Sequence, residues 1–582
     1  MGIPLFFRFY KDNFKEQTKS VKPKVTLPEL EIEIDNLMLD LNGPIHNATQ
    51  KIYGYGAYAK PPRMLGERIK VKSHAMKTQQ KVFENVCLQI EKLLSIVCPK
   101  KRLIICIDGP APLGKQSQQR KRRYKSAMDN SGECEFDSNS ITPGTEFMDR
   151  LGKYIDWYIR SRLSKDERWQ SLEVIFSSDR ACGEGEHKAM TYMRKYGNSE
   201  ETFCINGCDA DLIMLALGTH LPHIYVLRED IYDDYNDYYC LDIGGSHDRL
   251  AEIMYWESDQ HVFLKESAVN DFIFLCFMVG NDFLPHIPSI EIIEDGINMI
   301  ISVYKEVCGS YGHITETIET NIRLIKRPLA IFMATIGHYE KELLDTKLTR
   351  KSMYYQDMLL ESCSDIIKNE NKLTYSVNIA EYRKKYCETL FPACDNIENI
   401  CHQYIEGMQW VLSYYLKGVP SWRWLYPYHY APPAHILAQH INTFEFPVYE
   451  PSVPNTPFQQ LLCVLPPKSA HLLPTPLNDL LESKLSPLRP YCPDDFEIDV
   501  SGKRKEWEGI VLLPMVDYDL VCEVVSNNLQ HVDPKDLARN SPYPTVVYEY
   551  DRTYNSHYCS KYGSIKDCKV KTKCIELLDD TF

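Results

Sequence analysis

Four short runs rich in isoleucine, leucine and valine constrain the fold of this chain most strongly. Segments with helical spacing separate them, over 76–97, 146–163 and 187–196. Alternation of short apolar runs with helical segments favours an α/β domain whose sheet is largely parallel. The runs span residues 36–43, 102–109, 172–178 and 223–230.

Acidic residues follow these runs and gather beside glycine. Asp40 and Asp108 each stand at the carboxyl end of a run, which is the edge where parallel sheets place their active residues. In an extended or turn segment residues i and i+2 point the same way, so Glu184 with Glu186, and Asp209 with Asp211, can each present two carboxylates to one point. Three segments bring acids and glycine together, namely 183–187, 207–215 and 279–285.

Carboxylates that are forced together repel one another, and a divalent cation removes that cost. Magnesium prefers oxygen ligands, and two such ions can activate a water and stabilise the leaving oxygen of a phosphodiester. The alternative for any single aspartate at a strand end is a helix N-cap or a turn residue. Seven carboxylates are enough for two ions: Asp40, Asp108, Glu184, Glu186, Asp209, Asp211 and Asp282.

The stretch over 107–127 is cationic, although the whole chain has a net charge of −14. A negative net charge argues against a protein that coats nucleic acid nonspecifically. If 114–125 is helical, one face of the helix carries three cations and one amide, and Arg120 and Lys121 point away from it. Such a face is suited to bind a terminal phosphate. The alternative is a solvated charged helix. The face comprises Lys115, Gln119, Arg122 and Arg123.

Aromatic residues suggest contact with unpaired bases. His46 lies six residues after Asp40, and Trp422 and Trp424 lie in the aromatic segment 410–433. Single-stranded nucleic acid is commonly held by stacking on such rings. A structural histidine and a packed aromatic core are the alternatives, and the spacing by itself favours a metal-dependent phosphodiesterase.

The chain divides by composition into four parts. Residues 1–340 form the predicted nuclease region, 341–380 a linker or surface insertion, 381–520 a helical and proline-rich second region, and 521–582 a C-terminal extension. The proline-rich part is expected to wrap over the first domain. No stretch approaches the roughly 20 apolar residues that span a bilayer, and the scattered cysteines suggest a reducing compartment.

Seven motifs follow one another along the chain: LDLNGPIHN, IDGPAPLGKQSQQRKRR, ITPGTEFM, GEGEHK, DADLIML, GNDFLPH and SWRWLYPYHYAP. Their order resembles the Xrn family of 5′-to-3′ exoribonucleases, and the resemblance runs from residue 1 to about 520. Cys182 and the insert at 15–33 depart from the family pattern without touching a candidate ligand.

The resemblance implies a mixed-sheet nuclease core related to the PIN and flap-endonuclease folds. It assigns the seven carboxylates to two Mg²⁺ ions, with Mn²⁺ as a substitute, and the cationic face to the 5′-phosphate. His46 then stacks on the terminal bases together with Trp422 or Trp424. The implied reaction is hydrolysis of single-stranded RNA with a 5′-monophosphate, from decapped or cleaved transcripts, to 5′-mononucleotides.

The resemblance further favours a compact, viral-type cytoplasmic enzyme that receives substrate from decapping machinery, with a nuclear location as the alternative. It leaves the oligomeric state open. Two rival functions remain. A structure-specific DNA flap nuclease is expected to carry a helix-hairpin-helix motif, which we do not find, and a non-catalytic RNA-binding relative is disfavoured because all seven carboxylates are present.

Overall fold

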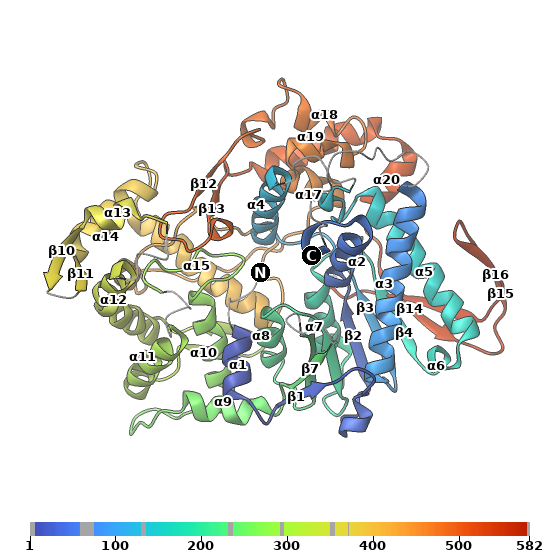
Figure 1. Cartoon of the computed structure of the whole chain (residues 1–582), viewed down its shortest axis with the longest axis horizontal. Coiled ribbons are helices and arrows are strands. Elements are labelled where there is room, and N and C mark those ends of the chain that lie inside the picture. The colour runs from blue at the N-terminus through green and yellow to red at the C-terminus, as the bar shows by residue number, and fades with distance from the viewer. Residues whose placement is uncertain are drawn as a thin grey trace.

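A nine-stranded mixed sheet forms the centre of the molecule (Figure 1). The computed structural model describes residues 6–58, 75–129, 136–230, 237–290, 296–349, 355–369 and 372–578. The strand order is β1-β7-β6-β5-β2-β3-β4-β14-β17. The strands are β1 (Thr18–Val21), β2 (Asn36–Asp40), β3 (Arg102–Cys106), β4 (Glu173–Ser177), β5 (Phe203–Asn206), β6 (Ile224–Glu229), β7 (Tyr238–Asp242), β14 (Thr545–Tyr550) and β17 (Val570–Ile575).

The inner strands are parallel, as the sequence predicts. Strand β2 pairs in parallel with β3 and β5, and β3–β4 and β5–β6 continue the parallel part. Strands β1, β7, β14 and β17 are added antiparallel at the two sides. All four apolar runs are strands. Strand β5 was not expected, because its four residues are too short to show a pattern.

Helices cover both faces of the sheet, and the alternation of side chains along β2 shows how. Leu37 and Leu39 pack in a core with helices α3 and α5, whereas Met38 packs on the other face with α7 and α8. Buried strands of this kind are apolar on both sides. The helices are α3 (Ala75–Val97), α5 (Glu146–Lys165), α7 (Gly185–Tyr196) and α8 (Asp211–Leu217).

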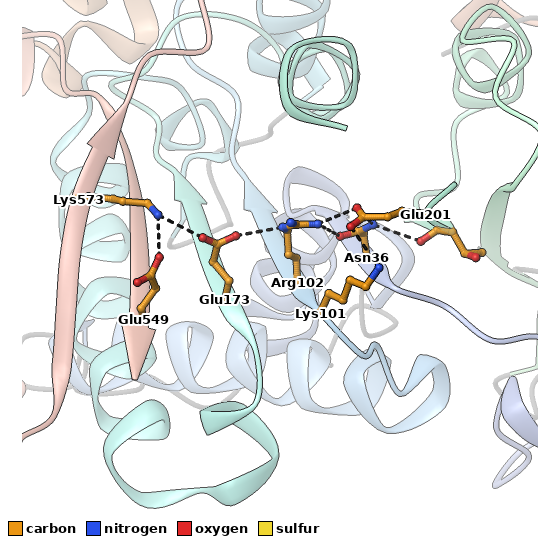
Figure 2. A network of polar contacts seen from close by, with 8 residues as sticks. Asn36, Lys101, Arg102, Glu173, Glu201, Glu549 and Lys573 are labelled. Carbon is orange, nitrogen blue, oxygen red and sulfur yellow. Dashed lines mark hydrogen bonds and ion pairs between the residues drawn. The ribbon is translucent and has the colours of Figure 1, made fainter. Parts of the chain in front are cut away.

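The last part of the chain, within the predicted C-terminal extension 521–582, completes the sheet. Strand β14 pairs with β4 and then with β17. A polar network crosses these strands at the amino-terminal ends of β3 and β4 (Figure 2). In it, Lys573 donates to Glu549 at 2.7 Å, and Arg102 donates to Glu173 at 3.0 Å and to Glu201 at 2.7 Å. The hairpin β15 (Ser556–Ser560) and β16 (Gly563–Cys568) projects beyond the sheet.

A helical region packs on the α8 face of the sheet and shares its core. Helix α12 (Lys326–Thr349) crosses the boundary expected at residue 340, and part of the expected linker forms a hairpin of β10 (Ser364–Asn369) and β11 (Lys372–Val377). The division of the chain into four parts stays a prediction. The other elements here are α9 (Ser246–Met254), α10 (Lys265–Met278), α11 (Gly296–Tyr311), β8 (Thr315–Ile318), β9 (Asn321–Leu324), α13 (Met358–Ser362), α14 (Ile379–Leu390), α15 (Ile397–Leu416) and α16 (Ala434–His440).

The proline-rich segment forms short helices with a small core of their own. That core takes in Leu113 from the start of α4 (Leu113–Asp129), so the segment covers this cationic helix. Among the described residues, we find no helix with the length and apolarity needed to cross a membrane. The remaining elements are α1 (Phe6–Asn13), α2 (Asn42–Tyr53), α6 (Glu167–Gln170), α17 (Pro457–Val464), α18 (Asp479–Glu482), β12 (Glu497–Asp499), β13 (Ile510–Leu512), α19 (Tyr518–Asn528) and α20 (Pro534–Asn540).

Candidate active site

Two aspartates lie side by side at the carboxyl ends of the central strands. Asp40 ends β2, and Asp108 follows the neighbouring β3 by two residues. The backbone N–H of Asn42 donates to Asp40 at 3.1 Å, while the Asn42 amide oxygen accepts from the backbone N–H of Asp108 at 3.3 Å. The turn after β2 thus holds the carboxylate of Asp40 and the backbone of Asp108.

The start of α7 brings two glutamates to the same place. Gly185 donates its backbone N–H to Asp108 at 2.7 Å, and a Cβ atom at Gly185 would lie 2.5 Å from an oxygen of Asp40. Only glycine permits this approach. Glu184 is extended, but Glu186 lies in the first helical turn, so the two side chains converge around a helix N-terminus rather than along one extended segment.

The described side chains include two groups that could hold a cation. Asp40, Asp108 and Glu186 form one group, and Glu184, Glu186 and His187 form the other, with ligand atoms within 4.8 Å of one another in each. Glu186 belongs to both. Carboxylate oxygens suit a hard divalent cation, so the donor set fits magnesium. His187 was not among the candidates, although it stands in the GEGEHK motif.

Burial makes the negative charges costly here. Burial, followed by the neighbouring Asp108, raises the pKa of Asp40 to about 8. Burial and then Glu184 raise the pKa of Glu186 well above its ordinary value, and burial and Asp282 raise that of Asp211 to about 6. Protons are held because like charges crowd a low-dielectric site, and a bound cation would replace them.

Lys115 joins the carboxylates to the cationic helix. Its ammonium group forms an ion pair with Glu184 and donates to Asp282 at 2.8 Å. Burial acts to raise the pKa of Asp282, but Lys115 holds that pKa below its usual value. Asp209 contributes to the same field, since its charge raises the pKa of both Asp40 and Asp211. All seven predicted carboxylates therefore share one electrostatic environment.

Two tyrosines of α15 orient acids of the site. The Tyr414 hydroxyl donates to Glu184 at 2.6 Å, and the Tyr415 hydroxyl donates to Asp211 at 3.1 Å. Sequence reasoning missed both roles. The WVLSYYLKG segment indicated only an aromatic region, because the contact depends on how α15 packs against α7 and α8.

The four residues of the predicted cationic face all lie on α4. Arg123 donates to the Thr142 hydroxyl at 2.9 and 3.0 Å, and Arg122 is exposed. The buried Gln119 accepts a hydrogen bond from Gln460 at 3.3 Å through its amide oxygen. Arg120 points away, as expected, and binds the backbone carbonyls of Pro514 and Tyr491.

His46 lies near this face and is uncharged at neutral pH. Burial, with the charges of Arg122 and Arg123, lowers the pKa of His46 to about 4. Its half-buried ring sits on α2, directly after the Asp40 turn. A neutral imidazole there is able to stack on a base while the arginines hold phosphate.

The two tryptophans are both buried, with 2% of Trp422 and 7% of Trp424 exposed. Trp424 stacks on Trp410 with ring centres 4.7 Å apart, and Trp410 stacks on Tyr414 at 4.9 Å. Within the described part of the chain, no ring contact joins His46 to either tryptophan. The stacking partner of His46 stays a prediction.

Comparisons with known proteins match nearly the whole length of the chain. The family model described as "XRN 5'-3' exonuclease N-terminus" matches residues 1–230, and "Xrn1 helical domain" matches 262–381 and 379–579. The chain is 27% identical to "5'-3' exoribonuclease 1" of Saccharomyces cerevisiae over 99% of its own length and 46% of that protein. It is 28% identical to the Homo sapiens protein of the same name, over 99% of this chain and 37% of that protein.

The chain covers a larger share of a second type of relative. Identity to "5'-3' exoribonuclease 2" of Candida albicans is 27%, over 93% of this chain and 74% of that protein. By contrast, the chain spans about half or less of the type 1 proteins from yeast and human.

Proposed function

The chain belongs to the Xrn family of 5′-3′ exonucleases, and from that premise we propose that it hydrolyses single-stranded RNA from a 5′-monophosphate end. The proposed products are 5′-mononucleotides. One observation carries this proposal: Lys115 belongs to the cationic face of α4 and also touches Glu184 and Asp282. A phosphate held on that face lies next to the carboxylates.

The cationic face would bind the terminal phosphate. Arg122 and Arg123 offer guanidinium forks, and Gln119 and Lys115 add an amide donor and an ammonium group. In this proposal the four side chains serve a single phosphate group, which favours a monophosphate end over a triphosphate or a cap. Binding at the terminus then positions the first phosphodiester over the carboxylates, which should raise turnover as well as affinity.

The seven carboxylates would hold two Mg²⁺ ions, for which Mn²⁺ is a substitute. Such ions supply an activated water and stabilise the leaving oxygen. Asp40, Asp108 and Glu186 form one candidate ligand group, and Glu184 belongs to the second. Tyr414 and Tyr415 orient Glu184 and Asp211, while Lys115 balances charge at Asp282.

The proposal also covers base stacking and the cellular location of the enzyme. His46, with Trp422 or Trp424, would stack on the terminal bases of single-stranded RNA. Stacking tolerates any base, because every base has a π-face, and this suits an exonuclease. We place the enzyme in the cytoplasm, with the nucleus as the alternative, and expect decapping machinery to supply its substrate. The cysteines of the described residues are free thiols, which suits either reducing compartment.

One assay separates this function from its rivals. RNA with a 5′-monophosphate and a label at its 5′ end is incubated with the protein and Mg²⁺. Immediate release of the labelled mononucleotide supports the proposal. Preference for a branched DNA duplex would indicate a flap nuclease, and RNA binding without any cleavage would indicate a non-catalytic relative.

A further inference from the structure

A cavity lies behind the carboxylates, away from the cationic face of α4. Its volume is about 900 Å³, and it is bounded by α7, the end of α15, the β8–β9 hairpin and residues 446–449 and 577–578. Of the residues considered above, His187, Tyr414 and Trp422 line this space, whereas the residues of the cationic face do not. A volume of this size accommodates a nucleotide.

The wall between this cavity and the candidate active site is one side chain thick. Gly183, His187 and Tyr414 line the cavity, and Tyr414 donates to Glu184 at 2.6 Å. The imidazole of His187 stacks on the Tyr414 ring with centres 3.9 Å apart. A molecule in the cavity would therefore lie beside the reaction centre without displacing its carboxylates.

The cavity contains cationic side chains. Its described lining includes five lysines and arginines and one acid, although Arg323 is paired with Glu316 and Lys188 is bound to backbone carbonyls. The Arg194 guanidinium makes a 3.4 Å hydrogen bond to Thr191 and has no carboxylate partner among the described residues. Burial lowers the pKa of Arg194 to about 10, so the group still carries its charge at neutral pH. An arginine without an acidic partner is suited to bind a phosphate.

The lining also includes apolar surface and a buried polar atom. Phe446, Val448 and Leu577 form an apolar part of the wall. Within the described part of the chain, Nε1 of Trp422 has no hydrogen-bond partner, although that side chain is only 2% exposed. Buried polar atoms normally find partners, so its lack of one here points to a missing polar ligand.

We propose that this cavity binds a free nucleoside 5′-monophosphate, with the phosphate on Arg194 and Lys417 and the nucleoside against the apolar wall. This inference rests on the proposed function, because the same compound is the product released on the other side of His187 and Tyr414. Product retained there would slow further hydrolysis without competing for the 5′ end of the RNA.

Calorimetry in EDTA tests this binding without turnover, using adenosine 5′-monophosphate, adenosine and inorganic phosphate as probes. Wild type, Arg122→Gln and the surface control Arg249→Gln should bind the nucleotide at this site equally well. Arg194→Gln and Lys417→Gln should each weaken that binding at least tenfold. Adenosine and phosphate should bind more weakly than the nucleotide, because each lacks half of the contacts.

Several results would overturn the inference. They are the absence of saturable nucleotide binding, equal binding of adenosine, and loss of binding in Arg122→Gln but not in Arg194→Gln. Weaker RNA binding by Arg194→Gln, with nucleotide binding unchanged, would make the cavity part of the RNA path instead. Nucleotide binding as expected in a protein that fails to degrade RNA would leave the cavity site intact and refute the proposed function.

Discussion

Glu184 is bound on two sides by residues that are far away in the chain. Lys115 forms an ion pair with one carboxylate oxygen, and Tyr414 donates to the other. Groups that orient a metal ligand commonly change metal affinity by 10- to 100-fold when they are removed. At the scale of single residues, the geometry of the site therefore depends on side chains that need not touch substrate.

Replacing Tyr414 by phenylalanine tests this dependence. The Mg²⁺ concentration required for half-maximal hydrolysis should rise by about 10- to 100-fold, because Glu184 loses its orienting donor. Tyr386→Phe is the matched control, since it removes a buried hydroxyl that donates to the Ala431 carbonyl at 3.1 Å. An unchanged Mg²⁺ requirement in Tyr414→Phe would show that the hydrogen bond has no role in metal binding.

His46→Ala should weaken RNA binding by about 1–3 kcal/mol for the lost stack, with no change in the metal requirement. Fluorescence anisotropy with short single-stranded RNA in EDTA measures this loss. Trp422→Ala and Trp424→Ala in the same assay identify the partner ring. Equal RNA affinity in His46→Ala and wild type would make His46 a structural residue.

At the scale of the elements, local patterns predict some parts of this fold and miss others for a physical reason. The runs at 36–43 and 102–109 are apolar on both faces, so they are recognisable as inner strands. Strand β14 pairs with β4 across more than 350 residues of chain, and β17 then pairs with β14; no local pattern encodes the pairing of β14 with β4. The same holds for Tyr414, whose role arises only when α15 packs against α7.

The network in Figure 2 explains how this distant pairing is held. Arg102 lies between Glu173 and Glu201, and Glu173 also meets Lys573 of β17 at 3.5 Å. Arg102→Leu should destabilise the protein by about 1–3 kcal/mol, because partly buried acids lose their partner. Arg249→Leu removes an exposed pair with Glu252 and should cost less than about 1 kcal/mol. Parallel denaturation with urea compares them, and equal midpoints would contradict this role of the network.

At the scale of the whole molecule, the crowded carboxylates link stability to pH and to metal. Because the folded-state pKa of Asp40 is raised to about 8, the folded protein holds a proton that the unfolded chain has lost. Its stability contribution is present at low pH and disappears as pH rises toward 8. The lowered pKa of His46 has the opposite effect on stability. It makes the folded protein less stable as pH falls below about 6.5, the ordinary histidine pKa.

In EDTA, the melting temperature should therefore fall between about pH 6.5 and 8, and the fall should be smaller in Asp40→Asn. Mg²⁺ should raise the melting temperature more at pH 8 than at pH 6.5, because the ion replaces bound protons. Differential scanning fluorimetry over this range provides the measurement. A Mg²⁺ effect that does not depend on pH would argue against the carboxylates as its binding site.

The central claim is that the cationic face of α4 reads a single 5′-phosphate beside the carboxylates. The most direct test is the ratio of initial hydrolysis rates on the same RNA with a 5′-monophosphate and with a 5′-hydroxyl end. Wild type should strongly prefer the monophosphate, and Arg122→Ala should lose most of that preference because a bidentate contact disappears. Lys125→Ala, on the same helix, removes a lysine that binds the Glu506 carbonyl and should keep the preference. Equal rates on both RNA ends in wild type, or an equal loss of preference in the two variants, would contradict the claim.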